Sequence, residues 1–538
     1  MKRFRALGSL IVLTLLALSC TAVGHRNDAE TTAADDDTGG DDGVLRFPDG
    51  FLLGTAIAGF QAEMGCPTLP QSECADPNSD WYQYVVSPEM LAAPLTFLSG
   101  QDPAVVGPGH WELFPSDFDL AAADLGSNAL RMNIEWSRVF PASTIGVEGY
   151  EALRAAADPA ALAHYHAVFA ALRERGLVPH VTLNHYTLPV WIHDAVGCHL
   201  DLRACSPRGW LDAETTVREI AKFAGFAARE FGGEVDLWTT ENEPLSALFP
   251  AYLMPTPGRT NPPALLLRSV EFKMAMAAMI EAHARMVDAI RAGDTIDADG
   301  DGVAARVGLV YNLTPVYPKD PANEVDQRAA VNVFHLWNLA FLDAVTLGLF
   351  DENLDGNAEF RDDLAGRMDF LGINYYGRMV VTGTKRPFLP GLSPLSTFNP
   401  ITAAYNQVYP RGIYEMTIVA QERYGIPLII TENNVGCDQT NGGANEVRFL
   451  IEHLTWLWRA IQEGIDVRGY FYWTLMDNYE WNHGMNSRCG LYAVDSADPA
   501  KTRTPRDIVS VFRAVTASGG IPPDLAARFP VDPDPQSE

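Results

Sequence analysis

The chain has 538 residues, of which 47% are hydrophobic, and its formal net charge at pH 7 is −29. This length and apolar content are sufficient for one large core or two medium ones. The negative charge argues against nucleic acid as a partner and is compatible with a neutral substrate or simply with a soluble secreted surface.

The first twenty residues form a separate unit. Basic residues near the start precede an apolar stretch over residues 6–18, and Ser19 and Cys20 follow it. This order is typical of a secretory signal, and the apolar stretch is too short to span a membrane. Because a small residue before a cysteine resembles a bacterial lipobox, we predict a lipoprotein-type signal peptide over residues 1–20. Cys20 would then be lipidated and would tether the secreted protein to the cell envelope, on a bacterial membrane. An ordinary signal peptide cut nearby is the alternative.

Both ends of the remaining chain are poor in apolar residues. Residues 21–45 contain no aromatic side chain, and aspartates cluster at 35–37 and 41–42. Such a segment cannot bury enough apolar surface to offset its ordering entropy, so we predict an acidic disordered tether. Residues 522–538 are rich in Pro and Asp and are expected to form an extended tail.

Between these ends, short apolar runs alternate with long amphipathic stretches. The helical pattern over 159–175 is the clearest, because Asp158 can cap it, Pro159 suits the first turn and Gly176 ends it. A second helical pattern covers residues 215–231. Eight runs are candidate strands: 52–56, 129–134, 178–183, 235–240, 306–311, 370–375, 428–431 and 467–474.

Near-continuous apolar strands that alternate with helices indicate a parallel sheet buried on both faces. Eight such units over residues 46–521 fit a single (β/α)₈ barrel with long loops better than an open doubly wound sheet. No glycine-rich dinucleotide or phosphate fingerprint is present, which argues against a nucleotide cofactor.

Two of these strands end in a carboxylate. Residues 238–244 read WTTENEP and place Glu243 after one strand, while residues 429–433 read IITEN and place Glu432 after another. In a parallel barrel both strand ends lie at the same face. Two carboxylates are what glycosidic bond cleavage requires, because one protonates the leaving oxygen and the other attacks or shields the anomeric carbon.

Residues 297–302 read DADGDG and begin like a calcium-binding loop, with Asp297, Asp299 and Asp301 in the first ligand positions. The twelfth position, however, is Gly308 where such a loop needs a glutamate. An acidic surface turn is therefore the favoured interpretation, and we predict no metal site, since no Cys/His spacing resembles zinc ligation either.

Several segments together carry a family resemblance. They are FLLGTA at 51–56, GFQAE at 59–63, DWY at 80–82, GPGHW at 107–111, the two glutamate segments, NYY at 374–376 and WTLMDNYEW at 473–481. With these motifs the chain resembles glycoside hydrolase family 1, the retaining β-glucosidases and β-galactosidases, and most of all its archaeal-type members. The resemblance implies a (β/α)₈ barrel, a β-linked glycoside or oligosaccharide as substrate, and no cofactor.

The resemblance also implies roles for residues around the two glutamates. Glu432 would be the nucleophile and Glu243 the general acid/base, at the separation of about 5 Å that retaining enzymes use. Arg131 would keep Glu432 ionised, Tyr376 would hydrogen-bond it, and Asn242 would bind the sugar 2-hydroxyl.

Further residues match the family's sugar-binding positions. Gln61 and His185 would bind hydroxyls, Trp473 would form an apolar platform, and Trp481 would donate from its indole. Glu480 would bind the outer hydroxyl groups of the sugar and would repel a phosphate group on it. Tyr186 stands where the family usually has tryptophan, so its sugar contact would differ in reach.

Four positions depart from the family pattern, namely Glu241, Leu245, Asn434 and Cys489. Because of these departures, a catalytically weak sugar-binding protein is an alternative to an enzyme. Since both glutamates and their supports are present, we predict a retaining exo-β-glycosidase, with a transglycosidase as the nearer alternative.

Without Cys20, six cysteines remain, an even number in an oxidising compartment. Cys437 and Cys489 follow sequential barrel strands, so their loops are expected to lie side by side. Buried free thiols are the alternative to the three predicted disulfides, Cys66–Cys74, Cys198–Cys205 and Cys437–Cys489.

Overall fold

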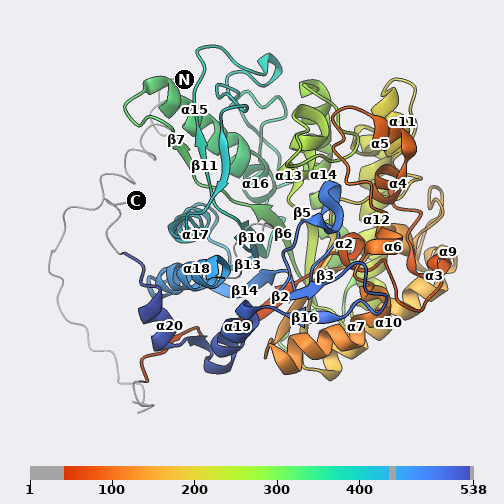
Figure 1. The fold of residues 1–538 in the computed structure, drawn as a ribbon. Coiled ribbons are helices and arrows are strands. Elements are labelled where there is room, and N and C mark those ends of the chain that lie inside the picture. The colour runs from red at the N-terminus through yellow and green to blue at the C-terminus, as the bar shows by residue number, and fades with distance from the viewer. Residues whose placement is uncertain (1–41, 436–443, 533–538) are drawn as a thin grey trace. The chain divides into compact units, whose positions relative to one another are not determined.

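Eight parallel strands close into a barrel, so the predicted fold class is confirmed (Figure 1). The computed structural model describes residues 42–435 and 444–532, and the chain from Val44 onward forms one compact unit. β14 pairs with β2, which closes the ring. The barrel strands in chain order are β2 (Leu52–Ala56), β3 (Ala129–Asn133), β4 (Val178–Asn184), β5 (Leu237–Asn242), β6 (Arg306–Asn312), β10 (Phe370–Tyr375), β13 (Leu428–Asn433) and β14 (Val467–Trp473).

These strands are covered on both sides. Every residue of β3, β10 and β13 is buried. Side chains fill the barrel interior and helices cover its outside, so apolar residues are needed at successive positions. This double burial explains why the strands are recognisable as near-continuous apolar runs.

A long helix follows each barrel strand; the first seven lead the chain to the next strand, and the last, α19, leads to β17 (Gly520–Ile521). Asp158 caps α10 as predicted, because its carboxylate accepts the backbone N–H groups of Ala160 and Ala161. The helices are α7 (His110–Asp119), α10 (Pro159–Glu174), α12 (Ala213–Phe231), α14 (Ser269–Gly293), α15 (Glu324–Phe334), α17 (Arg411–Tyr424), α18 (Ala444–Gln462) and α19 (Asp507–Ser518).

The two strands that carry the glutamates run further than the sequence suggested. β5 begins at Leu237 and ends at Asn242, and β13 continues to Asn433 because Glu432 still pairs with Asn374 of β10. The register shifts beside both sites, between Thr239 and Asn242 and between Ile373 and Asn374. Such irregularities change the direction in which nearby side chains point at the rim of a barrel.

The two ends of the barrel domain pair with each other. β1 (Leu45–Arg46) runs antiparallel to β17 (Gly520–Ile521), so the predicted tether stops short of Leu45. The prediction of an extended tail is wrong over Pro523–Arg528, which forms helix α20. Burial of Leu525 supplies the apolar anchor that the Pro- and Asp-rich composition concealed.

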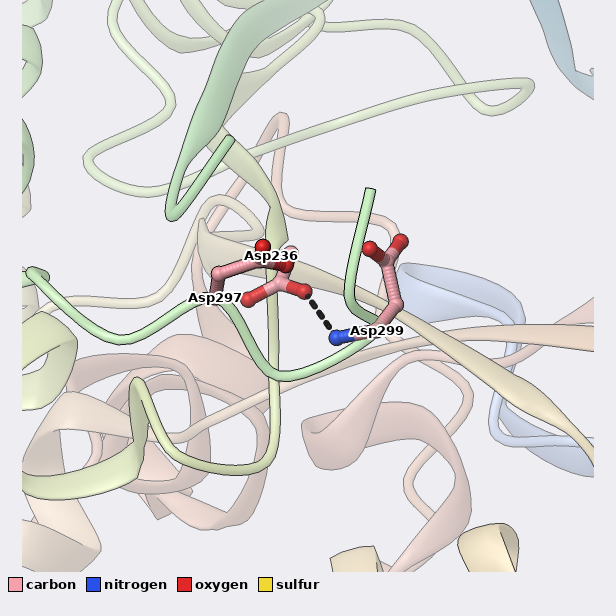
Figure 2. Close-up of side chains that lie close together, drawn as sticks. All are labelled: Asp236, Asp297 and Asp299. Carbon is pink, nitrogen blue, oxygen red and sulfur yellow. Dashed lines mark hydrogen bonds between the residues drawn. The ribbon is translucent and has the colours of Figure 1, made fainter. Parts of the chain in front are cut away.

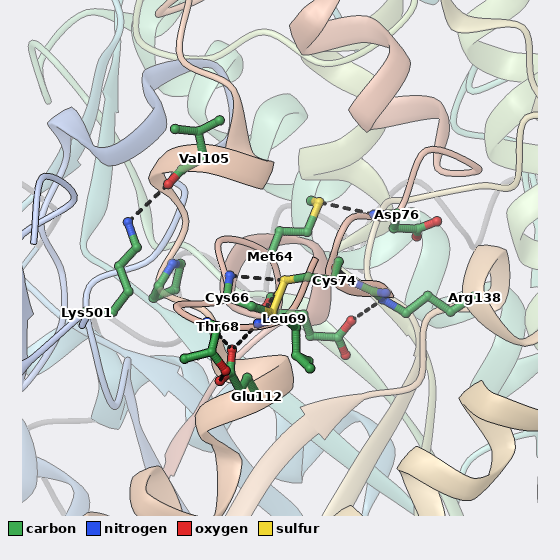
Figure 3. Close-up of a disulfide and its surroundings, with 12 residues drawn as sticks. Met64, Cys66, Thr68, Leu69, Cys74, Asp76, Val105, Glu112, Arg138 and Lys501 are labelled. Atoms are coloured by element: carbon green, nitrogen blue, oxygen red, sulfur yellow. Dashed lines mark hydrogen bonds and ion pairs between the residues drawn. A yellow bond between two sulfur atoms is a disulfide. The ribbon is translucent and has the colours of Figure 1, made fainter. Parts of the chain in front are cut away.

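Two of the predicted disulfides are confirmed. Cys66 and Cys74 pin the loop after β2, with their Cα atoms 6.0 Å apart, and Cys198 and Cys205 pin the loop after β4, at 5.0 Å. Figure 3 shows the first pair beside Arg138, whose guanidinium donates to the Cys74 carbonyl oxygen at 2.7 Å. Cys489 is also disulfide-bonded. Its predicted partner, Cys437, lies outside the described residues, so that pairing stays a prediction.

Candidate active site

Glu432, the predicted nucleophile, is held by two donors at the end of β13. Arg131 Nη1 lies 2.5 Å from Glu432 Oε1, and the Tyr376 hydroxyl donates to Oε2. Arg131 is fixed in turn by Thr182 Oγ1 at 3.2 Å and by Asn242 Oδ1 at 2.7 Å. Both carboxylate oxygens therefore have a defined partner and the group has one orientation.

Opposing effects act on the charge of this carboxylate. The pKa of the Glu432 carboxyl is raised to about 7 by their sum: burial raises it most, the Arg131 charge opposes that shift, and the nearby Glu243 carboxylate adds to it. Burial, and then the Glu432 charge, also raise the pKa of Tyr376 well above its usual value, so its hydroxyl remains a donor. The two glutamates are therefore close enough for the charge of Glu243 to act on Glu432.

Glu243, the predicted acid/base, stands directly after β5 at the start of α13 (Pro244–Leu248). Its backbone adopts the left-handed conformation, with φ 45° and ψ 60°. A residue other than glycine is strained there, and strain of this kind gathers at functional sites. The amide of Asn374 donates to Glu243 Oε1 at 2.7 Å, and the hydroxyl of Tyr186 donates to Oε2 at the same distance.

Asn374 is a site residue to which the sequence assigned no role. Its amide nitrogen also lies 3.2 Å from Asn242 Oδ1, and its own oxygen accepts from Thr431 Oγ1 at 2.7 Å. It thus connects the strands of both glutamates. The one available signal was its place at the end of β10, two residues before Tyr376.

Asn242 and His185 form a second buried pair. The Asn242 amide nitrogen lies 3.2 Å from His185 Nε2. Burial, followed by the charges of Arg131 and Arg259, lowers the pKa of His185 well below its usual value. The ring is therefore neutral, Nε2 accepts from Asn242, and Nδ1–H is the donor left for a ligand.

Gln61 and Glu480 meet on the side of the site formed by β2 and β14. Gln61, on α2 (Gly59–Ala62), donates from Nε2 to Glu480 Oε2 at 2.9 Å. Its buried Oε1 has no hydrogen-bond partner in the described part of the chain, which suits an acceptor for a sugar hydroxyl. Burial raises the pKa of Glu480, and the Arg259 guanidinium opposes that shift.

Arg259 is the second site residue that the sequence did not indicate. Its Nη1 lies 3.5 Å from Glu480 Oε1, and its guanidinium sits over the rings of Tyr186 and Trp481 at 5.3 and 5.2 Å. It belongs to a loop 221 residues before Glu480. No local pattern marks such a long-range contact.

Aromatic rings form the walls of the site. His185 stacks near Trp473 and Trp481, with ring centroids 5.9 and 6.0 Å apart. Trp473 ends β14, and both tryptophans are buried. The structure thus brings them together where a sugar platform and an indole donor were predicted. Those two roles stay predictions.

Tyr186 makes a contact that the sequence did not indicate, because its hydroxyl donates to the Glu243 carboxylate. Its predicted sugar contact stays a prediction. The backbone of Tyr186 has φ 74°, a left-handed conformation that no sequence pattern forecasts. This conformation accompanies the turn of the side chain toward Glu243.

Glu241, one of the four departures, is fully buried beside the site. Neither of its carboxylate oxygens has a hydrogen-bond partner among the described residues. Burial raises its pKa well above the usual value, and no neighbouring charge contributes. Burial therefore favours the neutral form of Glu241, in keeping with a side chain turned away from the charged site residues.

Asn434 and Cys489 join the loops after β13 and β14. Asn434 Nδ2 donates to the carbonyl oxygens of Trp473 at 2.5 Å and Cys489 at 3.1 Å. The Cys489 sulfur lies 4.0 Å from Glu480 Oε2. Both departures thus pack against residues of the predicted sugar site.

The acidic segment near residue 300 forms a turn before β6, and Figure 2 shows Asp297 and Asp299 of this turn beside Asp236, which precedes β5. Oxygens of Asp236, Asp297 and Asp299 lie within 4.8 Å of one another. Asp236 accepts the backbone N–H groups of Ala298 and Asp299, at 3.0 and 2.7 Å. Asp297 likewise accepts N–H groups of its own turn. The carboxylates thus stabilise the turn itself.

Comparison with known proteins places the chain in a family. The model of glycosyl hydrolase family 1 matches residues 44–521. The β-galactosidase of Pyrococcus woesei is 34% identical over 521 residues, covering 88% of this chain and 98% of that protein. The β-galactosidase of Sulfolobus acidocaldarius is also 34% identical, covering 90% and 97%.

Solved structures agree with this assignment. The β-glycosidase of Thermosphaera aggregans superposes with a TM-score of 0.75 at 32% identity, covering 90% of this chain and all 100% of that one. The β-glucosidase of Pyrococcus furiosus gives 0.74 at 29% identity, covering 90% and 98%. The chain therefore belongs to glycosyl hydrolase family 1, whose members hydrolyse glycosidic bonds.

Proposed function

We propose that this enzyme is a retaining exo-β-glycosidase that removes terminal non-reducing β-D-glycosyl residues by double displacement. The observation that carries the proposal is the pair of buried glutamates at the ends of β5 and β13, each with its own set of donors. Glu432 is held by Arg131 and Tyr376, and Glu243 by Asn374 and Tyr186.

The two glutamates act in turn. A Glu432 oxygen bonds to the anomeric carbon while the bond to the leaving oxygen breaks, and Glu243 gives that oxygen its proton. Water then attacks the anomeric carbon, the bond to Glu432 breaks, and the proton of the water passes to Glu243. This second proton transfer restores both residues.

The glycone is a neutral sugar in this proposal. Glu480 and Gln61 offer a carboxylate and an amide oxygen as acceptors for hydroxyl groups. A carboxylate at that place disfavours a phosphorylated sugar. Relatives named β-galactosidase and β-glucosidase are compatible with this class, whereas the 6-phospho-β-glucosidase GmuD of Bacillus subtilis, 30% identical over 408 residues, represents the phosphorylated class.

Two alternatives share much of this machinery. A transglycosidase uses the same residues and differs in the acceptor that reaches the intermediate. A catalytically weak sugar-binding protein is not favoured, because both glutamates and their donors are in place. Turnover of nitrophenyl β-glycosides separates enzyme from binder, and an aryl-glycoside panel identifies the glycone.

A 2-fluoro glycoside tests the roles directly, because the fluorine slows the second step and lets the intermediate accumulate. We expect mass spectrometry to place the sugar on Glu432, and Glu432→Ala to lose activity by several orders of magnitude. A sugar on another residue would contradict the assignment.

We also propose that the protein is exported and anchored through a lipid on Cys20. The support is the basic, apolar and Ser-Cys order of residues 1–20 and the disulfides of the barrel domain, which require an oxidising compartment. Labelled palmitate should enter the wild-type protein and should be absent from Cys20→Ala. Equal labelling, or a mature N-terminus elsewhere, would support an ordinary signal peptide.

A further inference from the structure

Tyr186 is held rigidly against the proposed acid/base. It follows β4, is buried, and has its hydroxyl 2.7 Å from Glu243 Oε2. The guanidinium of Arg259 lies over its ring, and the ring of Trp481 lies 4.8 Å away. Arg259 and Trp481 therefore hold the Tyr186 ring in the position from which its hydroxyl contacts Glu243.

The hydrogen bond has one possible direction when Glu243 is charged. Burial, and then the Glu243 charge, raise the pKa of Tyr186 well above its usual value, so the phenol keeps its proton. A carboxylate only accepts. Tyr186 is thus the donor and Glu243 Oε2 the acceptor.

The two glutamates differ in the kind of donor they receive. Among the described residues, Glu432 forms an ion pair, with Arg131, whereas Glu243 forms none. The side-chain donors that Glu243 receives from the described part of the chain are both neutral, the Asn374 amide and the Tyr186 phenol. These donors favour its charged form without the full charge of a cation, which would prevent it from acting as an acid.

Charged and titratable groups from several elements lie around Glu243. Arg259 acts on Tyr186 and Glu480, and Arg131 acts on Glu432. The Glu243 charge acts on five groups in the described part of the chain, which are Tyr186, Tyr311 of β6, Tyr376, Glu432 and Glu480.

We propose that Tyr186 is a positioning residue for the second half of the reaction, in which it stabilises the Glu243 carboxylate that takes the proton from the attacking water. The proposal rests on the acid/base role of Glu243. In this step the water oxygen bonds to the anomeric carbon, the bond to Glu432 breaks, and the proton moves to Glu243. Because the Tyr186 hydroxyl stabilises the charged form of Glu243, Glu243 can act as the base at a lower pH.

Tyr186→Phe removes the hydroxyl and keeps the ring under Arg259. A 2,4-dinitrophenyl glycoside makes the second step rate-limiting, because its leaving group needs no protonation. We expect kcat for this substrate to fall about tenfold on the acidic side, the scale of one hydrogen bond to a charged acceptor. For a disaccharide, whose leaving group does need a proton, the basic limb of kcat/KM is expected to move up by about one pH unit, because the Glu243 carboxyl of the variant then holds its proton to higher pH.

Azide separates this role from simple packing. Azide is an anionic nucleophile that needs no base, so it should restore kcat in Tyr186→Phe and have little effect on the wild type. Tyr311→Phe is the matched control, since Tyr311 is buried near Glu243 but its hydroxyl has no hydrogen-bond partner within the described residues. We expect that variant to keep the wild-type pH profile and azide response.

An unchanged pH profile in Tyr186→Phe, or a loss of kcat that azide does not restore, would overturn the proposal. A failure of the acid/base assignment itself is recognised separately. In that case Glu243→Ala would also show no azide rescue, and its losses would not depend on the leaving group.

Discussion

Arg131 reaches across the barrel to Glu432, placing Nη1 2.5 Å from Oε1 although 301 residues separate the two in the chain. Both side chains are almost completely buried, at 1% and 4% exposure. Arg131→Ala should lower the free energy of unfolding by about 3–5 kcal/mol, the usual result of leaving one partner of a buried pair uncompensated. Urea unfolding measures this loss.

Arg131→Ala combined with Glu432→Gln provides the control for that measurement. Because the neutral amide no longer needs a cation, the double variant should be less destabilised than the sum of the single changes. Additive losses would show that the two charges are not coupled.

Glu243→Ala should discriminate between leaving groups. A dinitrophenolate departs without a proton, whereas the sugar alcohol released from a disaccharide needs one. We expect the rate of the first step to fall by a further factor of about 10²–10³ for the disaccharide, the scale of general acid catalysis. Single-turnover rates for both substrates test this, and equal losses would exclude the acid role.

Glu480 should exclude phosphorylated sugars. Its carboxylate lies beside Gln61 Nε2, and a phosphate at the outer hydroxyls would meet a like charge. We expect the wild-type enzyme to have a lower kcat/KM for cellobiose 6-phosphate than for cellobiose. Glu480→Gln should reduce this difference in kcat/KM between the two substrates. Faster cleavage of the phosphorylated disaccharide by the wild-type enzyme would contradict this reading.

Acid should destabilise the fold through His283 on α14. Its Nε2 lies 2.7 Å from the Arg367 carbonyl oxygen, and burial lowers the pKa of His283 to about 4. Between pH 6.5 and 4 the unfolded chain therefore binds a proton that the folded chain does not. Stability should fall as the pH falls through this range, by about 3 kcal/mol from this residue.

Comparing denaturant unfolding at pH 7 and pH 5 tests this expectation, and His283→Gln should lose less stability on acidification than the wild type. His166 is the contrasting control, because contact with Glu234 raises its pKa. For this group folding favours protonation, so His166→Gln should lose more stability on acidification than the wild type. Identical pH slopes in the three proteins would refute both assignments.

Cys489 should be linked to Cys437. Cys489 is disulfide-bonded, and its loop joins that of β13 through the Asn434 hydrogen bonds. The link would close a loop of about fifty residues and add about 3–4 kcal/mol of stability in the chain-entropy model. Peptide mapping without reduction should recover a Cys437–Cys489 peptide, and any other partner for Cys489 would disprove the pairing.

The sequence predicted the barrel well because its signals are local. Strands buried on both faces appear as apolar runs, and α10 carries its own cap at Asp158. Glu243 and Glu432 were recognisable because each is a carboxylate at the end of such a run. The strand bounds were off by about two residues where bulges extend β5 and β13.

The remaining parts of the site depend on loops, whose conformation leaves no periodic signal. The contact of Tyr186 with Glu243 accompanies a positive φ, and Arg259 reaches Glu480 from a loop. The role of Asn374 follows from the registers of three strands. Likewise, the composition of residues 522–538 predicted an extended tail, whereas α20 forms there and buries Leu525.

The pairing of β1 with β17 brings the first and last strands of the barrel domain together, at the pole where the barrel strands begin. Glu243 and Glu432 stand at the opposite pole, where the strands end. A fusion partner or a solid support attached through either strand would therefore sit away from the entrance used by substrates. Joining the two ends by a short peptide, with new termini opened in a surface loop, would give a circularly permuted enzyme whose catalytic pole is undisturbed.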